Sequence, residues 1–373
     1  MPENFHIDMP EAVRNIIHTI EEHGFKAYAV GGCIRDSILG RNPDDWDITT
    51  SAVPSQIKTF FKRTIDTGIA HGTVTIMIDK TGYEVTTYRI DGEYEDGRHP
   101  KSVEFSDRLV DDLCRRDFTI NAMAYNDTDG FVDEFKGLDD LDTKIIRCVG
   151  EPELRFTEDA LRMMRAIRFS AQLGFTIDEA TWNAIKKLSP SISKISMERV
   201  HVELGKTLMS AHPDYVAQYS EAGLFAPILP VIDNALKSRY KRKILATLQH
   251  TPDNIYLRYA ALFITSTPDE AAKTLRALKL DNKTVNTVSK LVELSKMDIE
   301  ETEPAVRTAL NKYGRDFLPL WHELMMAVIQ ASEDTTGISN PAKVKHLLTL
   351  KRLGTDILAL GDCFTIKALD ISG

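Results

Sequence analysis

Two aspartates one residue apart, Asp45 and Asp47, carry the clearest chemistry in this sequence. Side chains alternate between the two faces of an extended segment, so both carboxylates project from one face while Trp46 turns to the other. Such a pair binds hard divalent cations, and Mg²⁺ keeps water and substrate phosphates as its remaining ligands. The pair therefore predicts a magnesium site, although Asp-x-Asp after Asn42 and Pro43 is also typical of a solvated loop.

A segment that has the pattern of a strand, a turn and a helix precedes the pair. The apolar run at residues 28–30 ends in Gly31 and Gly32, and the helical turn that follows carries Arg35. Glycine lets backbone N–H groups approach a phosphate, and the start of a helix adds positive potential. The same pattern also occurs as an ordinary connection, but its coincidence with the carboxylates favours a nucleoside triphosphate site.

Two further segments supply polar groups that suit such a site. Residues 83–89 alternate as a strand and place Glu84 on one face, where it is either a third carboxylate near the pair or a solvent-facing glutamate. Arg115 and Arg116 begin a helix that we expect over residues 115–124. The donor fork of arginine matches phosphate oxygens, so these two residues are either phosphate ligands or a salt-bridged helix entrance.

A later segment carries groups suited to recognising a base. The spacing predicts one helix over residues 157–169, with Asp159 and Arg162 near its start and Arg165 and Arg168 following at intervals of three. An aspartate accepts from an amino group and an arginine donates to ring nitrogens and carbonyls, so Asp159 and Arg162 can imitate the Watson–Crick partner of a base. The alternative is an ordinary exposed helix, because the helix dipole favours acidic residues near the start of a helix and arginines nearer its end.

The remaining patterns give the elements that must position these groups. Residues 10–23 have helical spacing, and residues 72–79 form a second alternating strand that a turn at residues 80–82 joins to residues 83–89. Residues 91–100 lack apolar periodicity and predict a loop, either a plain connection or a lid. From about residue 150 onward the chain is expected to be helical, and its 373 residues predict two to four domains.

The composition limits the partners and the compartment. With 46 basic and 55 acidic residues the net charge is −9, so any RNA contact needs a local basic strip, of which residues 236–243 are the clearest. The four cysteines are isolated in sequence, which argues against a zinc site or a redox dithiol. No leader-like N-terminus or membrane-length apolar run is present, so we expect a cytoplasmic protein that does not associate with membranes.

Four separated motifs resemble, in order and spacing, the class II tRNA nucleotidyltransferases, the bacterial CCA-adding enzymes of the polymerase β superfamily. They lie at residues 30–36, 45–47, 115–121 and 158–162, and the resemblance spans about residues 25–205. It implies an α+β fold in which a small mixed β-sheet catalytic head precedes all-α domains. The implied divisions are a nucleotidyltransferase head at 1–150, a helical neck with the base-recognising helix at 151–206, a body at 207–297 and a tail at 298–373.

The resemblance also implies an activity: the addition of C, C and A to the 3′ end of tRNA from CTP and ATP without a nucleic-acid template. The implied partner is tRNA that lacks all or part of its CCA, with no obligate protein partner. By the same resemblance Asp45 and Asp47 hold two Mg²⁺ ions, and Glu84 is an additional active-site acid. Nucleotide binding is then assigned to Gly32, Arg35, Arg116, Asp159, Arg162, Arg165 and Arg168.

Two features refine the resemblance. Residues 91–100 have the form D-G-x-Y-x-D-x-R-x-P, with Asp91, Tyr94, Asp96 and Arg98, of relatives that complete the whole CCA. The sequence ends in a segment that continues into further helices in relatives, so the tail is either short or truncated. A poly(A) polymerase of the same superfamily and a non-catalytic RNA-binding relative are the competing interpretations.

Overall fold

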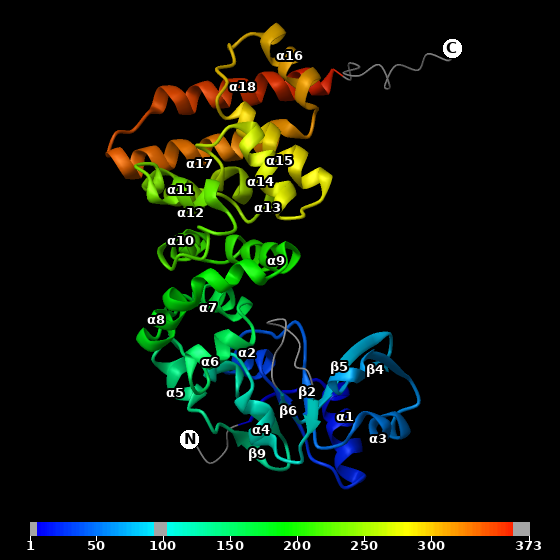
Figure 1. The fold of residues 1–373 in the computed structure, drawn as a ribbon. Coiled ribbons are helices and arrows are strands. Elements are labelled where there is room, and N and C mark those ends of the chain that lie inside the picture. Colours follow the sequence, from blue (N-terminus) through cyan, green and yellow to red (C-terminus); the bar gives the residue numbers. More distant parts are fainter. Residues whose placement is uncertain (1–5, 93–102, 361–373) are drawn as a thin grey trace. The chain divides into compact units, whose positions relative to one another are not determined.

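The computed structural model describes residues 6–92 and 103–360, and the chain divides into two compact units (Figure 1). The first unit comprises Met1–Ala166 and Phe175–Lys194, and the second comprises Ile167–Gly174 and Ile195–Gly373. In the described part of the chain all strands belong to the first unit, and the second is helical. The finer division into head, neck, body and tail stays a prediction.

A seven-stranded mixed sheet is the frame of the first unit. Its strand order is β3-β4-β5-β2-β1-β8-β9, and β2 and β5 are parallel while the other neighbours are antiparallel. The strands are β1 (Ala27–Val30), β2 (Ile48–Thr50), β3 (Thr64–Gly68), β4 (Thr73–Ile78), β5 (Thr81–Thr87), β8 (Ala124–Asn126) and β9 (Gly130–Val132). This sheet, followed by helices, confirms the expected α+β class.

The outer elements of the sheet follow from local sequence. Helix α1 (Glu11–Glu22) packs its buried apolar side chains, Val13, Ile16, Ile17 and Ile20, against β1 and β2. The expected β4–β5 hairpin is present, but its turn lies at Asp79 and Lys80, which both have positive φ, rather than at residues 80–82. Gly82 is paired within β5, where a Cβ would lie 2.9 Å from Cγ2 of Thr75, so glycine is required by close packing rather than by the turn.

The helix expected over residues 115–124 is wrong. Helix α4 (Leu109–Cys114) ends before it, and Phe118 has extended φ and ψ angles of −130° and 149°. The Phe118 side chain is fully buried and its backbone bridges to Cys148, which holds the chain away from a helical path. A single 3-10 turn, η2 (Thr119–Asn121), is the helical remnant, because tertiary packing overrides the local preference.

The single helix expected over residues 157–169 is also wrong, because two helices meet there. Helix α6 (Pro152–Glu158) ends at Asp159, and α7 (Leu161–Leu173) begins after Ala160. The Asp159 side chain accepts from the Leu161 backbone N–H at 3.0 Å, and its backbone carbonyl accepts from the Arg162 N–H. Asp159 therefore caps the start of α7, a position that aspartate prefers to a helix interior.

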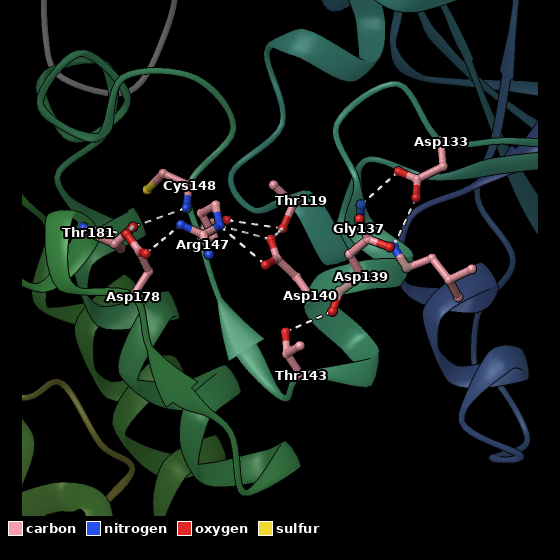
Figure 2. Close-up of polar contacts among 11 residues, drawn as sticks. Thr119, Asp133, Gly137, Asp139, Asp140, Thr143, Arg147, Cys148, Asp178 and Thr181 are labelled. Carbon is pink, nitrogen blue, oxygen red and sulfur yellow. Dashed lines mark hydrogen bonds and ion pairs between the residues drawn. The ribbon is translucent and has the colours of Figure 1, made fainter.

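The last part of the first unit is joined to the sheet by a polar cluster and a short strand pair. Figure 2 shows Arg147 between Asp140 of α5 (Gly137–Asp142) and Asp178, which caps α8 (Glu179–Leu188). Next to it β10 (Ile145–Ile146) pairs in parallel with β11 (Thr176–Ile177). These contacts explain why the segment up to Lys194 belongs with the sheet. The two-residue strand β11 lies beyond residue 150, where only helices were expected.

The second unit consists of helices, several of which begin with proline or follow a break that contains one. Its helices are α9 (Met197–Leu208), α10 (Ala217–Glu221), α11 (Pro230–Lys237), α12 (Lys241–His250), α13 (Ile255–Leu262), α14 (Pro268–Ala277), α15 (Asn282–Leu294), α16 (Glu303–Tyr313), α17 (Phe317–Thr336) and α18 (Pro341–Ala359). Four of these helices, α11, α14, α16 and α18, carry proline in their first turn, where its missing N–H has no helical partner to lose. Within residues 6–92 and 103–360, every helix is too short or too polar to span a bilayer.

Candidate active site

The carboxylate pair lies at the start of a central strand. Asp45 and Asp47 are both exposed and come directly before β2. The Val30 backbone N–H donates to the Asp47 carbonyl at 3.0 Å, so the contact between β1 and the β2 segment extends to this residue. Strand β5 runs parallel to β2 with Val85 opposite Ile48, which sets Glu84 beside Asp47 at the same strand end. The fold thus places Glu84 at the same strand end as the pair, but among the described residues the three carboxylates are not grouped closely enough to ligate one metal ion together.

The charges of these carboxylates act on one another. The pKa of Asp47 is raised because protein atoms displace water from its carboxylate, an effect that Arg116 opposes and Asp45 increases. The pKa of Glu84 is raised by desolvation and then by the charges of Asp47 and Asp45. Excess negative charge of this kind is relieved by a divalent cation.

The donor set fits a magnesium site that is open to substrate. In the parts of the chain that the structure describes, no three or more His, Cys, Asp or Glu side chains are grouped closely enough to hold a metal ion. A closed protein cage is therefore absent there. The pair of Asp45 and Asp47 instead suits Mg²⁺, which is commonly held by one or two carboxylates and completed by water and substrate phosphates.

The glycine turn lies against an arginine. Gly31 has φ of +85° and comes just before α2 (Gly32–Ile38). A Cβ on Gly31 would lie 2.8 Å from Nη1 of Arg116, which is the end of a flexible side chain, so it is the positive φ that requires glycine here. The turn between β1 and α2 and the Arg116 guanidinium therefore share one place in the first unit. The phosphate-binding groups predicted separately from sequence are brought together here.

A buried aspartate that the sequence predictions did not include holds this arginine. Asp112 is fully buried, and its carboxylate lies 3.2 Å from Nη2 of Arg116 and 2.6 Å from Nη2 of Arg115. Burial alone would raise the pKa of Asp112, but the two arginine charges hold it below its ordinary value. The sequence signal that could have identified Asp112 is its spacing, because it precedes Arg115 and Arg116 by three and four residues.

Arg35 belongs to a buried polar chain. Its Nη1 donates to Oδ1 of Asn121 at 2.6 Å, the Asn121 amide donates to Oδ1 of Asp117 at 3.0 Å, and Arg165 reaches Oδ2 of Asp117 at 2.6 Å. Arg35 is 8% exposed and also pairs with Asp36 at 2.7 Å. The chain connects α2 to α7 and includes Asp117 and Asn121, two residues outside the predicted nucleotide-binding set. Both lie inside the motif at residues 115–121, which was their sequence signal.

Arg162 lies close to the arginine pair. Its Nη1 is 2.6 Å from Glu158, and its Nη2 donates to the carbonyl of Arg115 at 2.9 Å. Glu158 also pairs with Arg155 at 2.6 Å, and Arg155 donates to the Cys114 carbonyl at 3.2 Å. The start of the predicted base-recognising segment is therefore fastened to the C-terminal end of α4, whose carbonyls attract cations.

Other predicted residues are placed elsewhere or lie outside the described residues. The Arg168 guanidinium is engaged in the second unit, with Glu203 at 2.5 Å and Gln172 at 2.7 Å, and it lies 3.8 Å from the centre of the Phe169 ring. Asp91 is the last residue of β6 (Arg89–Asp91), which pairs with β7 (Val103–Phe105). The predicted loop residues Tyr94, Asp96 and Arg98, and the C-terminal residues 361–373, are outside the described residues.

Comparisons with known proteins agree with this architecture. A model of the poly A polymerase head domain matches residues 27–147, and one of a probable RNA and SrmB-binding site of polymerase A matches residues 174–236. A CCA-adding enzyme of Streptococcus suis is 39% identical over 359 residues, which cover 94% of this chain and 84% of the relative. The crystal structure of Bacillus stearothermophilus CCA-adding enzyme in complex with CTP superimposes with a TM-score of 0.71 at 34% identity, covering 93% of this chain and 82% of that one.

Some relatives match over a shorter stretch. The CCA-adding enzyme of Limosilactobacillus reuteri is 48% identical over 230 residues, which are 60% of this chain. The chain spans about half of that relative's length, 56%.

Proposed function

We propose that this chain, which belongs to the family of CCA-adding enzymes, adds C, C and A to the 3′ end of tRNA from CTP and ATP. The observation that carries the proposal is the meeting of Asp45 and Asp47 with Arg116 and the Gly31 turn at one end of the central strands. Carboxylates for a metal and donors for a triphosphate are the two requirements of nucleotidyl transfer. The tRNA substrate is carried over from the relatives.

Each group of residues has a separate part in the proposed reaction. Asp45 and Asp47 would hold two Mg²⁺ ions, with Glu84 adding negative charge beside them. Mg²⁺ held by this pair would supply the activation of the 3′-hydroxyl for attack on the α-phosphorus and the neutralisation of charge on the leaving pyrophosphate. Arg116 and the backbone N–H groups at Gly31 and Gly32 hold the triphosphate.

Base selection is assigned to the segment around the start of α7. Asp159 would supply an acceptor and Arg162 would supply donors to the edge of a base, and Arg165 is proposed to support them through its ion pair with Asp117. Arg168 is proposed to stabilise α7 through Glu203. No nucleic-acid template is needed, because protein side chains take its place. The proposed substrate, tRNA, implies a cytoplasmic enzyme.

The activity is tested by incubating the protein with tRNA lacking its CCA end, CTP, ATP and MgCl₂, and by sequencing the product. We expect three added nucleotides in the order C, C and A, and one or two cytidines when ATP is left out. Open-ended addition of adenylate would identify a poly(A) polymerase instead. Tight tRNA binding without incorporation would identify a non-catalytic RNA-binding relative.

Arg162→Ala is expected to relax the choice of nucleotide more than it weakens triphosphate binding. A lost pair of hydrogen bonds to a base edge corresponds to roughly 1–3 kcal/mol of discrimination, so the preference for CTP over UTP should fall by about 5-fold to 150-fold. The measurement is kcat/KM for each of the four nucleotides on tRNA that lacks the CCA end. An equal loss for all four would contradict a role of Arg162 in base recognition.

Arg155→Ala is the matched control for Arg162→Ala. Both arginines pair with Glu158, and both donate to carbonyls at the end of α4. Arg155 is not among the residues assigned to the base. Its replacement should therefore lower activity for all nucleotides in the same proportion, which separates loss of the local ion-pair cluster from loss of base recognition.

A further inference from the structure

The buried carboxylate of Asp112 carries an inference that rests on the proposed function. We propose that Asp112 is a positioning residue, which holds the Arg116 guanidinium against the glycine turn and keeps it from pairing with the metal-binding carboxylate of Asp47. Arg116 would otherwise compete with Mg²⁺ for that carboxylate. Asp112 itself touches neither metal nor nucleotide in this account, and it acts only through the arginine.

The contacts of Asp112 fix its position on every side. One oxygen accepts from Nε and Nη2 of Arg115 at 2.9 and 2.6 Å. The other accepts from Nη2 of Arg116 at 3.2 Å and from the Thr49 hydroxyl at 3.1 Å, which shares its proton with the Thr86 carbonyl at 3.2 Å. Thr49 lies in β2, two residues beyond Asp47, so the anchor is tied to the strand that carries the carboxylate pair. A fully buried charge with this many partners has little freedom to move.

Arg116 has a second acidic neighbour to which it is attracted. Nη1 of Arg116 lies beside Gly31, and the backbone N–H of the preceding residue, Val30, donates to the Asp47 carbonyl. At this distance the arginine charge opposes the rise in the pKa of Asp47 that burial causes. Its Nε is buried and is not hydrogen-bonded, whereas its Nη2 is held by Asp112. A buried donor without an acceptor is unfavourable, so the guanidinium gains by turning toward any acceptor within reach. Asp112 opposes that movement, because breaking its own contact would leave a buried carboxylate with one arginine fewer.

The glycine turn limits the movement of the Arg116 guanidinium from its other side. Nη1 of Arg116 occupies the space into which a Cβ of residue 31 would project, at 2.8 Å. The arginine is therefore confined between the backbone of the turn and the Asp112 carboxylate. A triphosphate bound at the turn meets a donor that is already in place, which reduces the entropy lost on binding.

The inference is tested by comparing the wild-type protein with Asp112→Asn and Asp111→Asn. Asparagine keeps the shape of the side chain and removes its charge. Asp111 is the matched control, since it is on the same helix and accepts from the Ser106 hydroxyl at 2.6 Å rather than holding Arg116. The first readout is the Kd of Mn²⁺, followed by electron paramagnetic resonance, and the second is the Kd of CTP in the presence of EDTA.

We expect Asp112→Asn to raise both dissociation constants by about tenfold, while Asp111→Asn stays within about twofold of wild type. A double-mutant cycle then combines Asp112→Asn with Arg116→Ala. In that background Asp112→Asn should change Mn²⁺ affinity no further, because the arginine that it restrains is gone. An equal additional loss with and without Arg116 would show a merely structural role and overturn the proposal, as would unchanged affinities in a folded Asp112→Asn protein.

Thr49→Val keeps the test decisive if Asp112→Asn fails to fold. Valine has the shape of threonine but cannot donate to the Asp112 carboxylate, so the anchor is loosened without losing its charge. Mn²⁺ affinity should then fall by about threefold, and no change would overturn the proposal. Because these are binding measurements, they are distinct from the proposed function, which fails if wild-type protein binds CTP and Mn²⁺ but does not extend tRNA.

Discussion

Replacing Asp47 with alanine is expected to lower the rate of nucleotide incorporation by at least about a thousandfold. Asp47 lies at the strand end where Asp45, Glu84 and Arg116 interact electrostatically, so its loss removes half of the proposed metal-binding pair. The measurement is kcat for CMP addition to tRNA lacking its CCA end, at saturating CTP and MgCl₂. The fold should be retained, because Asp47 is not one of the buried residues of the core.

Asp44→Ala is the control for the Asp47 substitution. Asp44 is an exposed aspartate in the same loop and is not assigned to the metal. It should keep incorporation within about threefold of wild type. Unchanged incorporation by Asp47→Ala would refute the assignment of the metal site, and a comparable loss in both variants would indicate a general effect of loop charge.

Asp117→Asn is expected to lower the free energy of unfolding by about 3 kcal/mol. Asp117 is 8% exposed and holds Asn121 at 3.0 Å and Arg165, whose side chain is 33% exposed, at 2.6 Å, so the substitution removes the buried carboxylate of this ion pair. The value is measured by urea unfolding at pH 7. The exposed residue Asp107, replaced in the same way, should shift it by less than about 0.5 kcal/mol.

The pH dependence of unfolding provides an independent check on Asp117. Burial opposes ionisation, but Arg165, Asn121 and Arg162 hold the folded-state pKa of Asp117 well below its ordinary value. The stabilisation is therefore fully present above the unfolded-state pKa of about 3.9 and is lost as the pH falls below it, because the unfolded chain then binds a proton that the folded chain excludes. The difference in stability between wild type and Asp117→Asn should therefore narrow by about 1 kcal/mol as the pH falls from 7 to 3. A constant difference down to that pH would contradict the account.

Local patterns in the sequence were sufficient to predict much of the fold. The apolar period of α1 and the alternation of β4 and β5 involve neighbouring residues only, and both are confirmed. The two incorrect helix predictions have a different cause. At Phe118 burial of an aromatic ring overrides helical propensity, and at Asp159 a capping hydrogen bond divides one pattern between two helices.

The candidate site shows the same limit. Asp45, Asp47 and Gly31 are close in sequence, and their association was predictable. The approach of Glu84 depends on the parallel pairing of β2 with β5, which no local pattern determines. The role of Asp112 depends on burial, and a sequence shows an aspartate without showing whether water reaches it. The assignments of individual residues to metal, phosphate and base stay predictions until the substitutions are made.

The contacts of Arg162 bear on the fidelity of the proposed enzyme. Both terminal nitrogens of this arginine already have acceptors, Glu158 and the Arg115 carbonyl, before any nucleotide arrives. A base that uses these two nitrogens must therefore exchange one set of hydrogen bonds for another, so net affinity gains little from the contact. A mismatched base would leave both the arginine and its former partners unsatisfied. Such an exchange rejects wrong nucleotides without retaining the correct one, which suits an enzyme that must release its product after each addition and accept a different nucleotide at the third.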